Sequence, residues 1–206
     1  ADRTDNRPIA WMLAVASLGP IVLATAVLLD RTPDLALLLA APATPVPRRA
    51  RRWALAALAC VFVQTGLGGL IGTQFATLTC PDATSCGAWT WRQFVAGGAW
   101  DALRDPVVVD GVVAPPAGAA ALHVLHRLWS IVLAVAVLGV VQSSRQTRPG
   151  LAVGLLALLG AVLSAGVAAA ALQPTLAGVV LHNACAALLA ALLVRVAAGR
   201  AAATDT

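Results

Sequence analysis

Long apolar runs with few polar positions inside them dominate this chain of 206 residues. Five runs hold about 20 apolar residues each, the length that an α-helix needs to cross the roughly 30 Å hydrocarbon layer of a membrane. The runs lie at about residues 9–29, 53–77, 118–142, 150–171 and 175–197. The pattern predicts an all-α integral membrane protein, in which a bundle of four transmembrane helices is preceded by one additional transmembrane helix.

The segment between the first two runs is rich in proline and arginine, which favours a linker over a helix. We therefore place the main boundary there. Residues 1–51 are expected to form the N-terminal transmembrane helix and a Pro/Arg-rich cytoplasmic linker. Residues 52–206 are expected to form the four-helix bundle, with an external disulfide loop at about 78–117.

Composition supports the membrane assignment. Hydrophobic residues make up 60% of the chain and charged residues only 11%, whereas soluble domains average roughly 25% charged residues. Every basic side chain is an arginine and every acidic one an aspartate. The arginines lie at the ends of the apolar runs rather than in a patch interleaved with aromatics, which argues against a nucleic-acid partner.

The arginines also predict the orientation in the membrane. They gather in three segments: between the first and second runs, after the third run, and in the C-terminal tail (Arg31, Arg48, Arg49, Arg51, Arg52, Arg145, Arg148, Arg195, Arg200). Positively charged segments stay in the cytoplasm. The sequence thus predicts a multi-pass protein of the cell inner (plasma) membrane, with the N-terminus and the 78–117 loop external and the C-terminus cytoplasmic.

All three histidines fall inside predicted membrane helices. His126 and His182 each lie about 10–12 Å from the external end of their helix, at roughly 1.5 Å per residue. An imidazole in hydrocarbon is costly unless it pairs with or binds something. Two imidazoles at one depth on parallel helices of a bundle fit the two axial positions of one heme iron.

Other roles for the histidines stay open. In one alternative, each ring hydrogen-bonds a carbonyl of a neighbouring helix. Zinc could use His123 and His126, which lie one turn apart, but the local chain offers no third ligand. His123 is placed beside a heme propionate or at the entrance to the pocket. Arg127 either pairs with a propionate or extends to the interface as a snorkelling side chain.

The sequence CPDATSC contains Cys80 and Cys86 on the external side, where disulfides persist. A bridge closing this short loop would contribute about 2 kcal/mol and brace the loop. A redox-active dithiol that exchanges electrons with a partner is the alternative. Cys60 and Cys185, inside predicted helices, are expected to be small core residues.

Aromatic residues and glycines flank this loop. Trp89, Trp91 and Trp100 predict an interfacial aromatic belt or a short amphipathic helix that covers the pocket. In the second run, glycine recurs at a spacing that creates a small face (Gly66, Gly68, Gly69, Gly72). That face serves either helix packing or contact with a flat cofactor.

Three stretches in order, VQTGLGGLIGTQFATLTCPDATSC, LHVLHRLW and LQPTLAGVVLHNACAALLAALL, resemble the C-terminal half of the heme A synthase family. The resemblance covers roughly residues 52–198. It implies that His126 and His182 match the two axial ligands of that half's heme b, and that Cys80 and Cys86 match its loop disulfide. The family's eight helices form two such four-helix halves.

The chain also departs from the family. The family's N-terminal half carries the substrate heme and a glutamate one turn before its own His-Arg pair, and it has no counterpart in this sequence. His123 stands at the position equivalent to that glutamate, and the sequence contains no glutamate. The first helix occupies the place of the family's fourth helix but lacks a histidine.

Three functions follow from these observations. The first is a heme A synthase-like hemoprotein that transfers electrons, and that oxidises heme O to heme A only with a second four-helix half from another chain or a homodimer. The second is a non-catalytic b-type cytochrome or structural subunit of a larger respiratory complex, since iron with two histidine ligands does not readily bind oxygen. The third is a heme-free scaffold. The sequence leaves open whether the chain is an enzyme.

Overall fold

The computed structural model describes residues 46–80, 86, 91–101, 104–105, 107–171 and 176–199. Within these residues, four helices are long and apolar enough to cross a membrane. They are α3 (Arg48–Thr73), α5 (Ala119–Ser144), α6 (Pro149–Ala171) and α7 (Leu176–Ala198). Four of the five predicted spans are thereby confirmed as long apolar helices. The predicted helix at 9–29 lies outside the described residues, as does the linker before residue 46.

The start of α3 differs from the expectation. The helix begins at Arg48, directly after Pro47, rather than near residue 53. Arginine is a good helix former, and its long side chain reaches into a polar layer, so the helix continues beyond the apolar run. Arg51 Nε also donates to Ala197 O at 3.0 Å, which satisfies a carbonyl at the end of α7. The expected domain boundary after residue 51 therefore falls inside α3.

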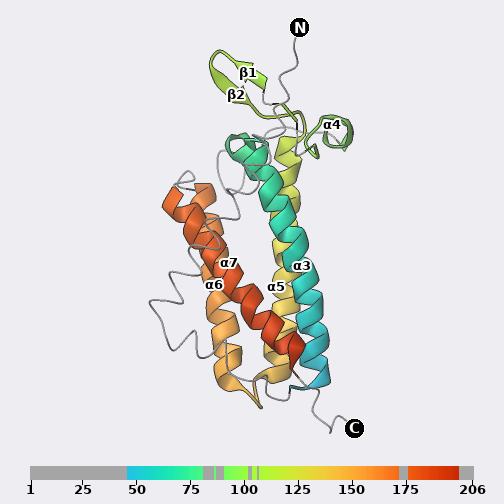
Figure 1. Cartoon of the computed structure of the whole chain (residues 1–206), viewed down its shortest axis with the longest axis vertical. Helices are drawn as coiled ribbons and strands as arrows, with labels where there is room; N and C mark the ends of the chain where they lie inside the picture. The colour runs from blue at the N-terminus through green and yellow to red at the C-terminus, as the bar shows by residue number, and fades with distance from the viewer. Residues whose placement is uncertain are drawn as a thin grey trace.

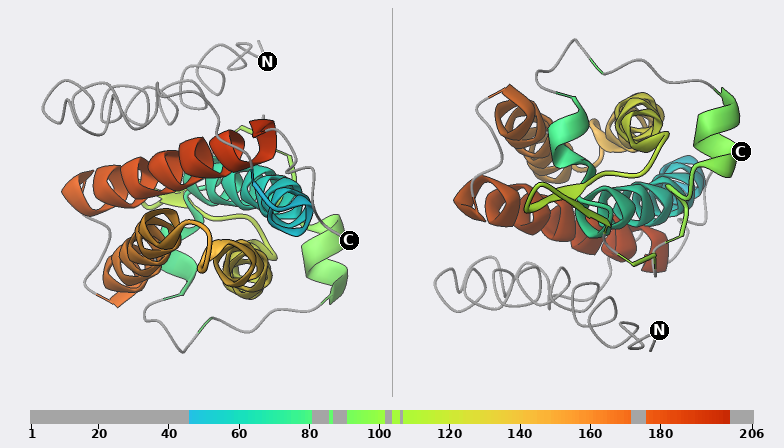
Figure 2. Two further views of the ribbon diagram at one scale, coloured as in Figure 1. Left: turned by 90° about the horizontal axis from the view of Figure 1, so that it is seen from below. Right: turned by 90° about the horizontal axis from the view of Figure 1, so that it is seen from above.

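The helices alternate in direction around a ring. α3 packs against α5 and α7, and α6 packs against the same two helices. Figure 1 shows that α5 and α7 run in the same direction, and the end-on views in Figure 2 place them diagonally across the bundle. We call the end where α3 finishes the loop end and the end where it starts the arginine end. A site between α5 and α7 would thus lie inside the bundle.

The buried core divides into two clusters. The larger cluster lies toward the arginine end and takes side chains from all four helices, among them Ala57, Val137, Leu155 and Leu193. The smaller cluster lies toward the loop end and is built from α3, α5 and the segments that follow α3. Among the described residues, α6 and α7 contribute no side chain to that second cluster. The two helix pairs separate toward the loop end, as Figure 1 shows.

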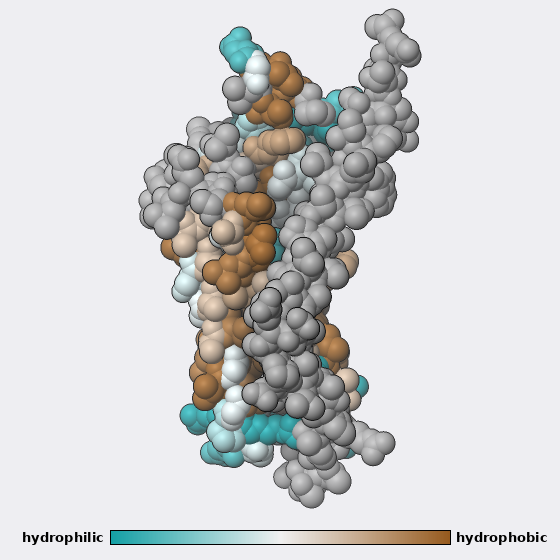
Figure 3. Space-filling model, turned by 60° about the vertical axis from the view of Figure 1, so that its left-hand side comes forward, coloured by the Kyte–Doolittle hydropathy of each residue, from teal (hydrophilic) through white to brown (hydrophobic). Residues whose placement is uncertain are grey.

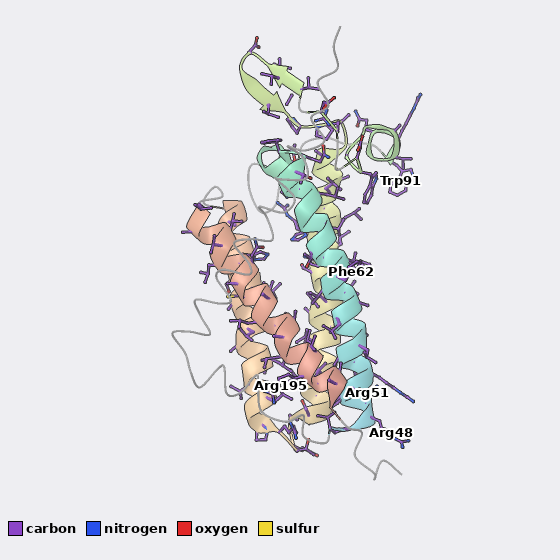
Figure 4. The ribbon with its side chains drawn as sticks, viewed as in Figure 1. Arg48, Arg51, Phe62, Trp91 and Arg195 are labelled. Atoms are coloured by element: carbon purple, nitrogen blue, oxygen red, sulfur yellow. A yellow bond between two sulfur atoms is a disulfide. The ribbon has the colours of Figure 1, made fainter. Side chains whose placement is uncertain are left out.

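The outer surface of the bundle is apolar. Phe62 on α3 is 82% exposed and Leu176 on α7 is 79% exposed, and Figure 4 shows Phe62 pointing away from the other helices. Figure 3 shows brown apolar side chains over the middle of the bundle and teal hydrophilic ones at its arginine end. This distribution is expected when lipid rather than water covers the helices.

The loop end carries short elements, of which the sequence analysis predicted only a short helix near the tryptophans. They are the 3-10 helix η1 (Ala76–Thr79), the helix α4 (Trp91–Ala96), and the strands β1 (Val107–Val109) and β2 (Val112–Ala114). The strands pair antiparallel as a hairpin. Its turn residues Asp110 and Gly111 both have positive φ, which the primed hairpin turns require. The described part of the chain is mostly helical, in agreement with the all-α class, and the hairpin is a short element that the sequence did not lead us to expect.

A buried glutamine ties α3 to the segments at the loop end. Gln74 directly follows α3 and is only 2% exposed. Its amide nitrogen donates to Asp101 O, and its Oε1 accepts from Arg104 Nε at 3.3 Å. Arg104 also donates to Ala114 O in the hairpin, at 3.2 Å. One polar network thus fixes the loop end against the bundle.

Candidate functional site

Two histidines lie on diagonal helices, and each contacts the other helix of its own pair: His126 contacts α3 and His182 contacts α6. His126 on α5 and His182 on α7 each lie about 9–10 Å from the loop-end start of their helix, at roughly 1.5 Å per residue. Both are half-buried, and His126 lies within electrostatic range of His182. The depth of the two rings in a membrane stays a prediction.

Each imidazole packs beside a glycine of the neighbouring helix. A Cβ at Gly68 on α3 would lie 3.4 Å from His126 Cε1, and a Cβ at Gly166 on α6 would lie 3.1 Å from His182 Cε1. Any larger side chain would compete with the ring for this space. Of the glycine face predicted on α3, Gly68 alone has this contact, since added Cβ atoms at Gly66, Gly69 and Gly72 would meet nothing within 4 Å.

His182 is oriented by a backbone carbonyl. Its Nδ1 lies 2.9 Å from Val162 O, so Nδ1 carries the hydrogen and donates it. The lone pair of a neutral imidazole is then on Nε2. Histidines that bind metals usually have this arrangement, in which a carbonyl fixes the tautomer through the other ring nitrogen.

His126 is held by a side chain instead. Gln64 Nε2 lies 3.1 Å from His126 Nε2 and also donates to His126 O at 3.1 Å. His126 Nδ1 and Gln64 Oε1 are buried and have no hydrogen-bond partner. Sequence reasoning missed Gln64, although a polar amide inside an apolar membrane helix is a signal in itself.

The structure gives His123 and Arg127 other contacts. His123 Nε2 donates to Ala76 O in η1 at 2.8 Å, so this ring joins α5 to the segment after α3. Arg127 NH1 donates to Cys86 Sγ at 3.5 Å. The expected proximity of His123 and Arg127 to a propionate stays a prediction. Among the described residues, no three His, Cys, Asp or Glu side chains gather as a metal site.

The cysteines fall into two classes. Cys80 and Cys86 form a disulfide at the loop end. Cys60 is buried in the larger core cluster, and Cys185 packs against that cluster. Trp129 Nε1 donates to Cys60 O at 2.9 Å, a contact that joins α5 to α3 midway along the bundle.

These features define a class: a multi-pass α-helical membrane protein whose bundle contains two half-buried imidazoles on diagonal helices. A family model described as cytochrome oxidase assembly protein (COX15-CtaA) matches residues 11–194. The chain therefore belongs to this family, the heme A synthase family. No curated protein and no solved structure matches the chain.

Proposed function

We propose that the chain is a heme A synthase-like membrane hemoprotein that binds a b-type heme through His126 and His182 and transfers electrons. The observation that carries the proposal is the matched pair of imidazoles. They lie seven and six residues from the loop-end starts of two parallel helices, and each packs beside a glycine of the adjacent helix. Membership of the family supports a role in heme A biosynthesis.

The residues present fit a heme in three respects. The hydrogen bond from His182 Nδ1 to Val162 O leaves Nε2 free to bind a metal. Gly68 and Gly166 keep the space beside both rings free of side chains. In the described part of α7, the buried side chains of the larger core cluster all lie on the arginine-end side of His182. In α6 they extend from the arginine end only as far as Val162, which contacts His182. A heme with two imidazole ligands supplies one-electron transfer.

The other residues of the site would orient and enclose the cofactor. Arg127 follows His126 directly and offers a guanidinium for an acidic group of the heme. His123 anchors α5 to η1 and so shapes the loop end of the pocket. The disulfide between Cys80 and Cys86 braces the same region, because Arg127 contacts Cys86.

A non-catalytic b-type cytochrome, or structural subunit of a larger respiratory complex, is the second candidate. The observation that favours it is the pairing itself, because iron with both axial positions filled transfers electrons but does not readily bind oxygen. The sequence also contains no glutamate to match the family's acid. Oxidation of heme O to heme A would require a second four-helix half.

The charge distribution supports one orientation in the inner (plasma) membrane. Figure 4 shows Arg48, Arg51 and Arg195 at one end of the bundle, and Trp91 of α4 at the other. By the positive-inside rule, the arginine end is cytoplasmic and the loop end is external. Trp91 is largely exposed and would lie at the external interface of the bilayer.

The decisive experiment is an absorption spectrum of the full chain purified from membranes. We expect the reduced spectrum of a six-coordinate low-spin heme. His126→Ala and His182→Ala should each abolish it, because each removes one axial ligand. His123→Ala is the matched control and should keep the low-spin spectrum, because His123 bonds Ala76 O. Retention of the spectrum in both ligand variants would refute the assignment.

A second experiment separates the two functions. Heme O is supplied to the purified chain with a reductant and oxygen, alone and together with a candidate partner half. Appearance of the oxidised heme in either reaction supports the synthase-like function. Absence of conversion in both, with the low-spin spectrum intact, supports the cytochrome or structural subunit.

A further inference from the structure

Gln64 is a polar side chain within the apolar helix α3, and its amide nitrogen contacts one residue at two atoms. Its amide nitrogen lies 3.1 Å from His126 Nε2 and 3.1 Å from His126 O. A carbonyl oxygen accepts hydrogen bonds and cannot donate them, so the group that faces it must be the amide NH2. The carbonyl contact therefore determines which way the amide points.

The orientation of the amide determines the tautomer of the ring. The second N–H of Gln64 points at His126 Nε2, and a donor at that position requires a lone pair on Nε2. The ring hydrogen must then be on Nδ1. His126 thus has the same tautomer as His182, whose Nδ1 donates to Val162 O. Both histidines present an unprotonated Nε2.

The two helix pairs use equivalent positions for this purpose. Gln64 lies one helical turn before Gly68, and Val162 lies one turn before Gly166. In each pair, the glycine packs beside the imidazole and the residue one turn earlier hydrogen-bonds it. The second pair uses a main-chain oxygen. In the first pair the ring interacts with the backbone of Gln64 and also with its side-chain amide, and only the side-chain contact can be changed by substitution.

Two buried atoms at His126 are left without partners, and they are complementary. In this tautomer Nδ1 carries a hydrogen to donate, while Gln64 Oε1 is an acceptor. Unpaired buried polar atoms are costly, so the arrangement favours a change that pairs them. If Nε2 binds a metal, the Gln64 amide nitrogen can no longer contact Nε2. Gln64 Oε1 can then accept the hydrogen of His126 Nδ1 on the same ring.

We propose that Gln64 is the positioning residue of His126: it keeps Nε2 unprotonated in the heme-free protein and accepts the Nδ1 hydrogen when Nε2 binds iron. The second half of this proposal, on iron binding, rests on the proposed function. The first half, on the tautomer of His126, concerns the heme-free chain alone. Metal-binding histidines depend on such partners, whose loss typically costs about 10- to 100-fold in metal affinity.

The first half is tested by 15N NMR of the heme-free full chain, labelled at histidine, in lipid nanodiscs. We expect the His126 signals of the tautomer protonated at Nδ1, assigned by comparison with the His123→Ala and His182→Ala variants. Gln64→Glu replaces the donor by an acceptor and should move the hydrogen to Nε2. Gln64→Met keeps the approximate shape without either group and should give a mixture. Thr65→Val is the control, because Thr65 bonds its own helix at Val61 O.

The second half is tested by heme titration and by the heme midpoint potential. Gln64→Met should lower heme affinity by about 10- to 100-fold and raise the potential, because the imidazole loses an acceptor that increases its donor strength. Gln64→Glu should lower the potential relative to wild type. Thr65→Val should match wild type in both measurements. Circular dichroism of every variant checks that the helices form.

The outcomes are distinguishable. A wild-type chain that binds no heme refutes the proposed function, and the tautomer measurement still decides the first half of this inference. A wild-type His126 protonated at Nε2, or a tautomer that both Gln64 variants leave unchanged, overturns the inference. Heme bound through His126 with unaltered affinity and potential in both variants overturns its second half.

Discussion

A single methyl group at Gly166 should damage heme ligation without unfolding the bundle. The Cβ of Gly166→Ala would lie 3.1 Å from His182 Cε1 and 3.3 Å from its Nδ1. Carbon atoms in favourable contact are about 3.5–4.0 Å apart, so the ring must retreat by about 0.4 Å. Metal–ligand distances are held within about 0.2 Å, and the displacement exceeds this tolerance.

The same retreat strains the hydrogen bond that orients the ring. His182 Nδ1 donates to Val162 O at 2.9 Å, and a shift of this size would lengthen or bend that bond. We expect heme affinity to fall by about 10-fold or more, as for the loss of other partners of metal-binding histidines. The heme-free bundle should not lose stability to the same degree, because alanine is favoured over glycine in a helix by about 1 kcal/mol.

The assay is a heme titration followed by absorption, with thermal unfolding of the heme-free chain measured in parallel. Gly160→Ala is the matched control on the same helix, because a Cβ there would meet nothing within 4 Å. Gly68→Ala should have a smaller effect than Gly166→Ala, since its Cβ would lie 3.4 Å from the His126 ring. Equal affinity in the Gly166 and Gly160 variants would refute the reasoning.

Three further substitutions test the packing around the site. Gly139→Ala places a Cβ against the indole of Trp53, so it should cost about 1–3 kcal/mol of unfolding free energy while the heme spectrum is unchanged. Cys86→Ser opens the disulfide with Cys80 and should lower the free energy of unfolding by about 2 kcal/mol. If the bridge is structural, a partner still reduces the heme of this variant, and if the pair is a redox dithiol, that reduction fails. Gln74→Leu leaves its hydrogen-bond partners unpaired, which should cost about 1–3 kcal/mol and speed proteolysis of the loop end.

The membrane helices could be predicted because a chain in lipid has few ways to satisfy its backbone hydrogen bonds. An apolar run of about 20 residues in hydrocarbon must satisfy its own backbone, and a helix does so locally. The ends were less certain, because arginines at the start of α3 continue the helix beyond the apolar run. The hairpin had a signal in VVVDGVVA, where Asp110 and Gly111 separate two valine runs. The sequence analysis treated this segment only as part of a loop between helices.

The candidate site could be predicted only in part. The position of His126 and His182 near the loop-end starts of α5 and α7 follows from counting residues along two helices, whereas their joint binding of one heme stays a prediction. Gln64 and Gly166 could not be assigned in the same way, because their roles depend on which helix lies beside which. The contact of Arg127 with Cys86 has the same origin, since it depends on how the loop folds over α5.

The candidate site takes one imidazole from each of two similar helix pairs. Along α5 and α7, the buried side chains recur at the same distances from each histidine (Leu133 and Leu189, Ala136 and Leu192, Val137 and Leu193, Val140 and Val196). Each pair supplies one imidazole, one glycine beside it and one hydrogen-bonding partner, so neither pair forms the site alone. The pairs meet in the core cluster toward the arginine end. The packing of that cluster therefore sets the separation of the two imidazoles, and substitutions there should alter heme affinity without contacting either ring.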